Sequence, residues 1–281
     1  MIEIKYVCSN GKEYNLVGDR MRATSGYFHE YEWKPSTAEQ EIGVDVYGFT
    51  KDPKTYQMTL TLRGPLNERK RQLNELTDSW EYDIVNVTPG RIWFGTYYID
   101  CYIKEMSNKV SSTRRNWIDC EIGIYCPYPM WAEEQTKRFW PDSAEKGEAY
   151  EFLDYPYDYV YDYSKPSSGT EHWNIDHYRS NNFEMIIYGP CANPRITIAG
   201  QVYQVFETLE EREYIVIDSR KKTIIKYLSN GTRQNIFYKK NTGSSIFAEI
   251  PSGDLLISWS GTFGFDITVF KERSVPRYGT D

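Results

Sequence analysis

Few residues in the sequence have the types and spacing that catalysis or metal binding requires. The 281 residues include three histidines, His29, His172 and His177, and no two of them have the four-residue spacing of helical zinc proteases. The sequence also lacks a glycine-rich phosphate loop and the glycine-flanked serine of α/β hydrolases. We therefore expect no catalytic residue, no bound metal ion and no cofactor.

Two groups of acidic residues have a structural explanation as well as a chemical one. A glycosidase requires only two carboxylates across a cleft, so acidic residues alone do not rule one out. We interpret the first group as a solvated connection between strands: Glu207, Glu210, Glu211 and Glu213. The second group could supply oxygen ligands to calcium, but its spacing matches no known calcium loop. We expect this group on an exposed strand: Asp154, Asp158 and Asp162.

The cysteines and the first residues indicate a protein made in a reducing compartment. The five cysteines are odd in number and contain no C-x-x-C pair: Cys8, Cys101, Cys120, Cys126 and Cys191. The first seven residues carry charges where a secretory signal needs an apolar region. No apolar run reaches the roughly 18 residues of a membrane span. We expect reduced core cysteines, synthesis in a cytoplasm and no membrane span.

Composition argues against nucleic-acid binding and is compatible with large contact surfaces. The net charge is −7, and neither half of the chain has an excess of basic residues, so nucleic acid is not an expected partner. The 25 tyrosines and 8 tryptophans are residue types enriched in protein interfaces. Tyrosine is also frequent in strands, so a β-rich fold without any interface explains the same composition.

The first half of the sequence predicts strands around one helix. Apolar and polar residues alternate around residues 57–63, 97–103 and 118–124, the pattern of half-buried strands. After Pro65, which suits a first helical turn, apolar residues recur at helical spacing: Leu66, Leu73, Leu76 and Trp80. We expect the other face of this helix to be exposed, including Glu68, Arg69 and Arg71.

The second half predicts a β-sandwich. Prolines at 127 and 129 end the strand pattern and a charged stretch follows, so we place one boundary near residue 135, between domains 1–135 and 136–281. Beyond it, short alternating segments recur at about ten-residue spacing. They lie at residues 184–188, 195–206, 213–218, 223–227, 246–250, 254–259 and 265–270. The predicted fold class is mainly β, with two β-sandwich domains and one helix in the first.

Four segments, by their order and spacing, resemble those of a known family. They are residues 56–64 (YQMTLTLRG), 88–98 (TPGRIWFGTYY), 121–131 (EIGIYCPYPMW) and 193–198 (NPRITI). Together with the charged helix after the first segment, they resemble the distal tail protein family of siphophages and related prophages. The resemblance covers most of the chain.

This resemblance implies a structural, non-enzymatic role in a virion. The family's first domain assembles into a hexameric ring at the tip of a long non-contractile tail, and its second domain is a galectin-like β-sandwich. The implied partners are the tail tube protein, the tail-tip protein and receptor-binding or baseplate proteins, with assembly in the bacterial cytoplasm. Under this hypothesis Glu68, Arg69 and Arg71 contribute to subunit or tube contacts; a solvated helix face is the alternative.

The galectin-like half raises the alternative of a carbohydrate-binding adhesin. The NPR string echoes part of the galectin string H-x-N-P-R and makes Arg195 a candidate sugar contact, although Cys191 occupies the histidine position. The galectin string that supplies a stacking tryptophan is missing. The candidate stacking rings are Trp131, Trp140, Trp173 and Trp259, with Trp173 as the position to test. A glycosidase or peptidoglycan hydrolase is a third hypothesis, which rests only on the available carboxylates.

Overall fold

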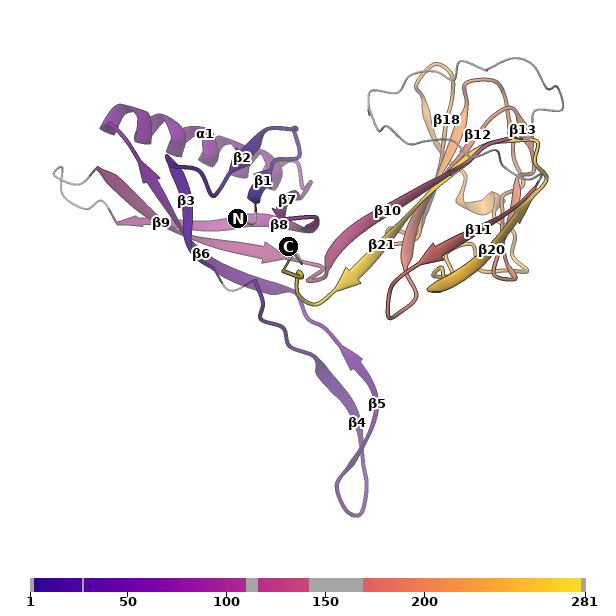
Figure 1. The fold of residues 1–281 in the computed structure, drawn as a ribbon, viewed down its shortest axis with the longest axis horizontal. Helices are drawn as coiled ribbons and strands as arrows, with labels where there is room; N and C mark the ends of the chain where they lie inside the picture. Colours follow the sequence, from indigo (N-terminus) through magenta and orange to yellow (C-terminus); the bar gives the residue numbers. More distant parts are fainter. Residues whose placement is uncertain (1–2, 27, 110–115, 142–168, 279–281) are drawn as a thin grey trace. The chain divides into compact units, whose positions relative to one another are not determined.

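The described part of the chain is mainly β-structure and divides into two compact units. The computed structural model describes residues 3–26, 28–109, 116–141 and 169–278, and one α-helix lies among them. Unit 1 contains Met1–Glu133 and Glu272–Asp281, and unit 2 contains Glu134–Lys271 (Figure 1). The expected mainly β class with one helix in the first half is confirmed. No helix in the described ranges is both long and apolar enough to cross a membrane.

Unit 1 is built from two antiparallel sheets that share the long strand β8 (Tyr97–Lys109). The first part of β8 pairs with one sheet and its last part with the other. One sheet has the order β2 (Glu13–Asn15), β1 (Ile4–Val7), β7 (Gly90–Phe94), β8. The other has the order β3 (Met21–Gly26), β6 (Lys54–Arg63), β9 (Trp117–Cys126), β8. Their apolar faces form one core, in which Leu60, Ile92 and Ile124 are fully buried.

Helix α1 (Leu66–Val85) packs on β8 and β6 through a single apolar stripe. Leu76 is fully buried and Trp80 nearly so, while Leu73 packs against the same core. Their spacing of three and four residues is the period that puts helical side chains on one face. Leu66 was expected on this face but is 44% exposed, because it occupies the first helical position.

A two-stranded hairpin in unit 1 was not expected from the sequence. Strands β4 (Lys34–Glu39) and β5 (Val44–Thr50) pair with each other and with no other described strand. The hairpin extends away from the sheets of its own unit (Figure 1). At its base, the Trp33 indole donates a hydrogen bond to the Ser274 hydroxyl at 3.2 Å.

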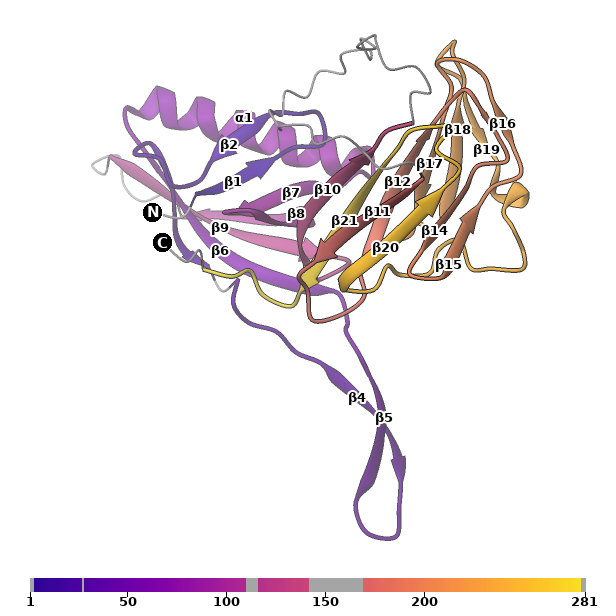
Figure 2. The ribbon, with the colours of Figure 1, turned by 45° about the vertical axis from the view of Figure 1, so that its right-hand side comes forward.

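Unit 2 has two antiparallel sheets enclosing a second apolar core (Figure 2). The smaller sheet has the order β11 (Thr170–Ile175), β20 (Gly253–Trp259), β14 (Arg195–Ile198), β15 (Gln201–Gln204). The larger runs β19 (Arg233–Asn235), β18 (Thr223–Tyr227), β17 (Tyr214–Asp218), β12 (Asn182–Tyr188), β21 (Phe265–Arg273), β10 (Trp131–Phe139). A short pair, β13 (Cys191–Ala192) with β16 (Thr208–Leu209), and the 3-10 turn η1 (Phe237–Lys239) complete the unit.

Most strands expected in the second half are present, with two corrections. The segment 195–206 contains β14 and β15, joined by a turn at Ala199 and Gly200 with positive φ angles of 48° and 85°. Residues 246–250 form a loop rather than a strand, and their alternating isoleucines, Ile246 and Ile250, are buried anchors of that loop. The charged stretch after residue 132 belongs to strand β10, because its polar side chains alternate toward solvent.

Candidate assembly surfaces

The described histidines and acidic residues form no metal-binding group, and a buried cysteine is protonated. No three His, Cys, Asp or Glu side chains in the described ranges are grouped so that they could hold a metal ion. His29 stacks on Tyr278 with ring centres 4.2 Å apart, and His172 lies 3.6 Å from the Asp254 carboxylate. Burial raises the pKa of the Cys126 thiol to about 12, so this thiol remains protonated. The Asp154, Asp158 and Asp162 group lies outside the described residues.

The acidic run before β17 is a solvated connection only in part: Glu210 and Glu211 are exposed between two strands, as expected, whereas Glu207 and Glu213 belong to an ion-pair network. The Lys226 ammonium lies 2.8 Å from the Glu213 carboxylate and 3.3 Å from that of Glu207, and Lys239 also pairs with Glu207. The side chains of Lys226, Glu207 and Glu213 are at most 12% exposed. The hydrogen bond from Lys226 lowers the pKa of Glu213. Because lysines neutralise both carboxylates, the network stabilises unit 2 and does not resemble a glycosidase pair.

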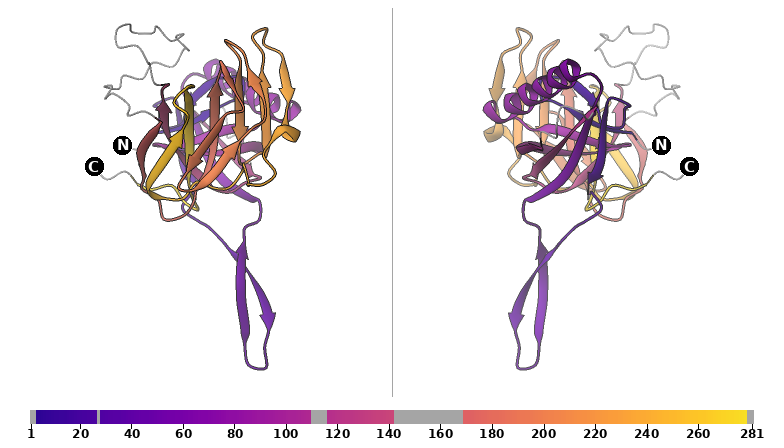
Figure 3. Two further views of the ribbon diagram at one scale, coloured as in Figure 1. Left: turned by 90° about the vertical axis from the view of Figure 1, so that its right-hand side faces the viewer. Right: turned by 90° about the vertical axis from the view of Figure 1, so that its left-hand side faces the viewer.

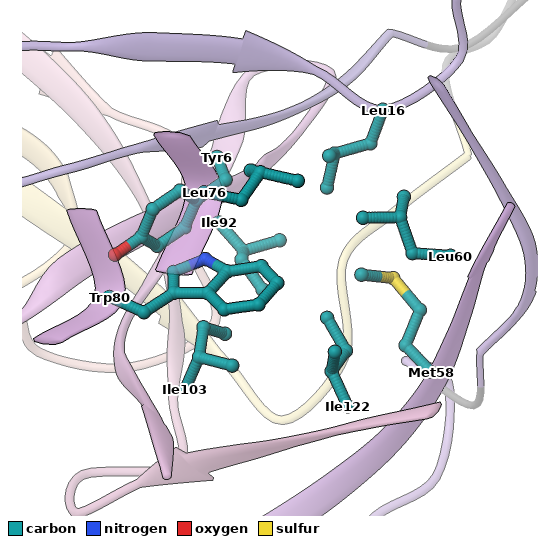
Figure 4. Close-up of a pocket in the computed structure, with 9 residues that line it drawn as sticks. All are labelled: Tyr6, Leu16, Met58, Leu60, Leu76, Trp80, Ile92, Ile103 and Ile122. Atoms are coloured by element: carbon teal, nitrogen blue, oxygen red, sulfur yellow. The ribbon is translucent and has the colours of Figure 1, made fainter. Parts of the chain in front are cut away.

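A small hollow lies in the core of unit 1. This hollow has a volume of about 10 Å³, the space of a single water molecule (Figure 4). The lining consists of core side chains from both sheets and α1, including Leu60, Leu76 and Trp80. These side chains point toward one another and form a packed core.

Three of the four candidate sugar-stacking tryptophans are core residues, which corrects the expectation for Trp173; the fourth, Trp140, is half-buried. Trp173 on β11 is 6% exposed and packs edge-on against Phe139, and Trp259 is 8% exposed. Trp131 is fully buried in the core of unit 1. A ring covered in this way cannot stack on a sugar. Arg195 on β14 is exposed, but the buried Trp173 cannot supply an aromatic ring for a sugar that contacts Arg195.

The three polar residues of α1 have three different environments. Arg69 is only 6% exposed, which corrects the expected exposed position. It precedes Leu73 by four residues and Leu76 by seven, so it belongs to the packed stripe. Glu68 is half-buried and accepts a hydrogen bond from Arg20, while Arg71 is exposed and lies 3.8 Å from Glu75. Arg71 is therefore the one of the three that is available to a neighbour.

A buried carboxylate fixes the end of α1 to the first strand. Asp83 is fully buried and accepts hydrogen bonds from the Tyr6 hydroxyl, from the Cys8 thiol at 3.1 Å and from the Ser9 amide at 2.9 Å. Burial and the neighbouring carboxylate raise the pKa of Tyr6 well above its usual value, so the phenol remains a donor. No sequence pattern indicates this cluster, because the partners of Asp83 are more than 70 residues distant along the chain.

The β4–β5 hairpin carries an exposed apolar surface. Its exposed fractions are 94% for Ile42, 55% for Val44, 51% for Val46, 76% for Tyr47 and 60% for Phe49. Figure 3 shows the hairpin from two opposite sides. A lone two-stranded hairpin is only marginally stable in water, and contiguous exposed apolar groups mark binding surfaces. The hairpin therefore has the properties of an arm that becomes covered on assembly.

A second apolar surface lies at the end of α1. It comprises Tyr82, Ile84, Val85 and Val87, which are between 43% and 80% exposed. Val87 has a positive φ of 50°, a conformation that is costly for a β-branched residue. We call this group the helix-end surface. It differs in shape and sequence from the hairpin, so unit 1 offers two unlike apolar surfaces.

The fold of the chain is shared with phage hub and baseplate proteins, although the sequence matches no protein-family model and no curated protein. The crystal structure of the Dit protein of phage SPP1, described as a hub of the adsorption apparatus of phages that infect Gram-positive bacteria, is similar with a TM-score of 0.61 and 9% identity. This similarity covers 96% of the present chain and 99% of that chain.

Two structures of the phage p2 baseplate in its activated conformation, with calcium and with strontium, are similar as well. Their TM-scores are 0.63 and 0.62, with 13% and 14% identity. In each case 98% of the present chain and 100% of the other chain are covered. The shared fold thus extends over both units.

Proposed function

We propose that the chain is a structural distal tail protein that forms a hexameric hub ring at the tip of a long non-contractile phage or prophage tail. The observation that carries the proposal is the nearly complete coverage in both directions between this chain and a phage hub protein. A protein that shared only a common β-sandwich would match one unit. Here the similarity covers nearly all of the residues of both units.

The two unlike apolar surfaces of unit 1 support assembly into a closed ring. A cyclic ring with more than two subunits is heterologous, so each subunit must present two different faces that fit each other. The hairpin and the helix-end surface supply two different candidate faces, since both are apolar and they share no residue. We assign the hairpin of one subunit to a contact with the unit 1 of its neighbour.

The proposed ring joins the tail tube protein to the tail-tip protein and to receptor-binding or baseplate proteins. The protein would be located in the virion after assembly in the host cytoplasm. The fully reduced cysteines among the described residues are compatible with assembly in a reducing compartment. Exposed Arg71 remains a candidate for subunit or tube contacts.

Mass measurement of the purified full-length chain tests the proposal. Light scattering and native mass spectrometry should give a mass six times that of the 33.1 kDa chain, and negative-stain images should show rings. A strict monomer across the micromolar range, also after addition of a tail tube protein from the same phage, would contradict the hub role. The proposal assigns no enzymatic activity, and clearing of bacterial cell walls in a zymogram would contradict that part.

A further inference from the structure

One segment of unit 2 is basic although the protein is acidic. Residues 219–248 contain seven lysines and arginines and no aspartate or glutamate, while the whole chain has a net charge of −7. The net charge of each half of the chain does not reveal this segment, because acidic residues elsewhere in the second half outnumber its basic ones. The segment forms β18 and β19 at one edge of the larger sheet (Figure 2), then η1 and the following loop, which is held against β15 at the edge of the smaller sheet.

Some of these charges are neutralised within the unit, and others face solvent. Lys226 and Lys239 pair with Glu207, and Lys221 lies 3.4 Å from Asp218. Lys222, Arg233 and Lys240 have no carboxylate within ion-pair distance among the described residues. These three side chains instead lie over aromatic rings.

Aromatic rings in this segment lie beside the lysine ammonium groups. Phe237 and Phe247 stack with ring centres 5.9 Å apart, and the Lys240 ammonium lies 3.7 Å from the centre of the Phe237 ring. The Lys222 ammonium is 5.6 Å from the Phe247 ring centre. Tyr238, next in sequence to Phe237, is 76% exposed. Phe237 and Tyr238 are exposed and Phe247 is half-buried, and such rings interleaved with cations are suited to ligands that combine a flat apolar face with negative charge.

An open hollow of about 420 Å³ lies in the same segment, formed by residues 240–247. This volume is in the range of small-molecule sites. The loop is held on β15: the Asn241 amide donates to the Gln204 carbonyl at 3.0 Å, and the Ser244 hydroxyl donates to the Val202 carbonyl at 2.9 Å. The hollow is therefore preformed in the free protein.

The lining of the hollow contains the groups that recognise polyols and anions. Thr242 and Ser245 are exposed, and their hydroxyl groups have no hydrogen-bond partner among the described residues. Lys240 supplies a cation and Phe247 supplies an apolar wall. Hydroxyl donors fix sugar or polyol oxygens, and an ammonium group forms the stronger, charge-assisted bond to phosphate or carboxylate.

We propose that the hollow at residues 240–247, together with Lys222, binds an anionic saccharide, a sugar or polyol unit that carries phosphate or carboxylate. A protein strand that adds to the sheet edge fits less well, because β19 has only three residues and offers few main-chain hydrogen bonds. The residues of the site all belong to unit 2, and they include neither Trp173 nor any residue of the hairpin or the helix-end surface.

Binding of defined polymers to the full-length chain tests this site. Calorimetry with poly(glycerol phosphate) tests the phosphate source of negative charge, and a polyuronate tests the carboxylate source. Neutral dextran and poly-glutamate are the comparison ligands for an uncharged saccharide and for an acidic peptide. We expect binding to one or both anionic saccharides that weakens with added salt. The site is disproved if no anionic saccharide binds, or if dextran or poly-glutamate binds equally well.

Two double variants separate charge from saccharide recognition. Lys222→Gln with Lys240→Gln should lower the affinity about tenfold, since two charge-assisted contacts are removed. The matched control, Lys12→Gln with Lys104→Gln, makes the same charge change on exposed lysines of unit 1 and should bind as the wild type does. An equal loss in both variants would show that net charge alone acts, which would overturn the proposal.

Removal of the hydroxyl groups tests the polyol contact without any change in charge. Thr242→Ala with Ser245→Ala should weaken binding of the anionic saccharide and leave the thermal unfolding curve unchanged, because both residues are exposed. Unchanged saccharide affinity would contradict the hollow as the site. Ring assembly should be unaffected in all of these variants, so that this proposal and the proposed hub role can fail independently.

Discussion

Replacement of the two exposed rings of the β4–β5 hairpin should prevent ring assembly without unfolding the subunit. Tyr47 and Phe49 are 76% and 60% exposed in the isolated chain. Neither ring belongs to the core of unit 1, so Tyr47→Ser with Phe49→Ser removes little folding free energy. If the hairpin is covered in the ring, the same change removes a large part of the contact.

The exposed fractions set the size of the effect. An aromatic side chain buries about 200 Å², so about 150 Å² of Tyr47 and about 120 Å² of Phe49 remain to be covered. At about 25 cal/mol per Å², complete burial of both contributes about 7 kcal/mol to each subunit contact. Even half of this, about 3.5 kcal/mol, corresponds to a loss of about three-hundredfold in the association constant.

Native mass spectrometry and light scattering measure the outcome over the micromolar range. The matched control is Phe206→Ser with Tyr238→Ser, which removes the same two ring types from unit 2 at exposed fractions of 50% and 76%. We expect the hairpin variant to be monomeric and the control to form rings, with equal melting temperatures. Rings of unchanged stability in the hairpin variant, or equal losses in both, would refute the assignment of the hairpin as an assembly arm.

Three further changes test other parts of the structure. Gly90→Ala should destabilise unit 1 by about 2 kcal/mol in chemical denaturation, because the added Cβ would meet Asp83 and Tyr6 oxygens at 2.4 and 2.6 Å. Arg71→Glu should weaken the ring and reduce its salt sensitivity while the melting temperature stays the same. Because the folded-state pKa of Glu213 is lowered, its stabilisation is present above its ordinary value of 4.5 and is lost as pH falls. The melting temperature should therefore fall on acidification below that value, and less steeply in Lys226→Gln.

Each of these outcomes has a matched comparison. Gly48→Ala adds a methyl group with nothing within 4 Å and should leave stability unchanged; an equal loss in both glycine variants would contradict the steric account. Ring assembly of Arg71→Glu with unaltered salt dependence would remove Arg71 from the interface. Identical acid sensitivity of Lys226→Gln and the wild type would show that other carboxylates determine the pH dependence.

Local patterns in the sequence were sufficient for the helix and for many strands of the sheets. Alternation identified β6, β9 and β18 because one face of each strand is buried, and the three-and-four spacing of Leu73, Leu76 and Trp80 identified α1. The hairpin was missed because none of its residues faces a core, so no selection for alternation acts on it. Strand β10 was missed because its polar face is charged and proline residues precede it.

The functional surfaces were less predictable than the elements, because they depend on tertiary contacts. Arginine is usually exposed, but Arg69 lies on the face of α1 that packs against the core and is therefore buried. Trp173 has the residue type of a sugar platform, yet alternation on β11 places it toward the core of unit 2. The separation of Glu207 and Glu213 from Lys226 along the chain gave no sign that they form one network. For Arg69 and Trp173, the face of the helix or strand on which the residue lies determined its burial, and the residue type did not.

The division of unit 1 into two stretches of chain has a consequence for the order of events during synthesis. Residues from Glu272 onward leave the ribosome only after all of unit 2 has been made. They supply Glu272, which accepts a hydrogen bond from Tyr128 at 2.8 Å, and Tyr278, which stacks on His29. Unit 2 can thus complete its core while unit 1 still lacks its last contacts. Translation itself would then delay the assembly-competent form of unit 1 until the whole subunit is present.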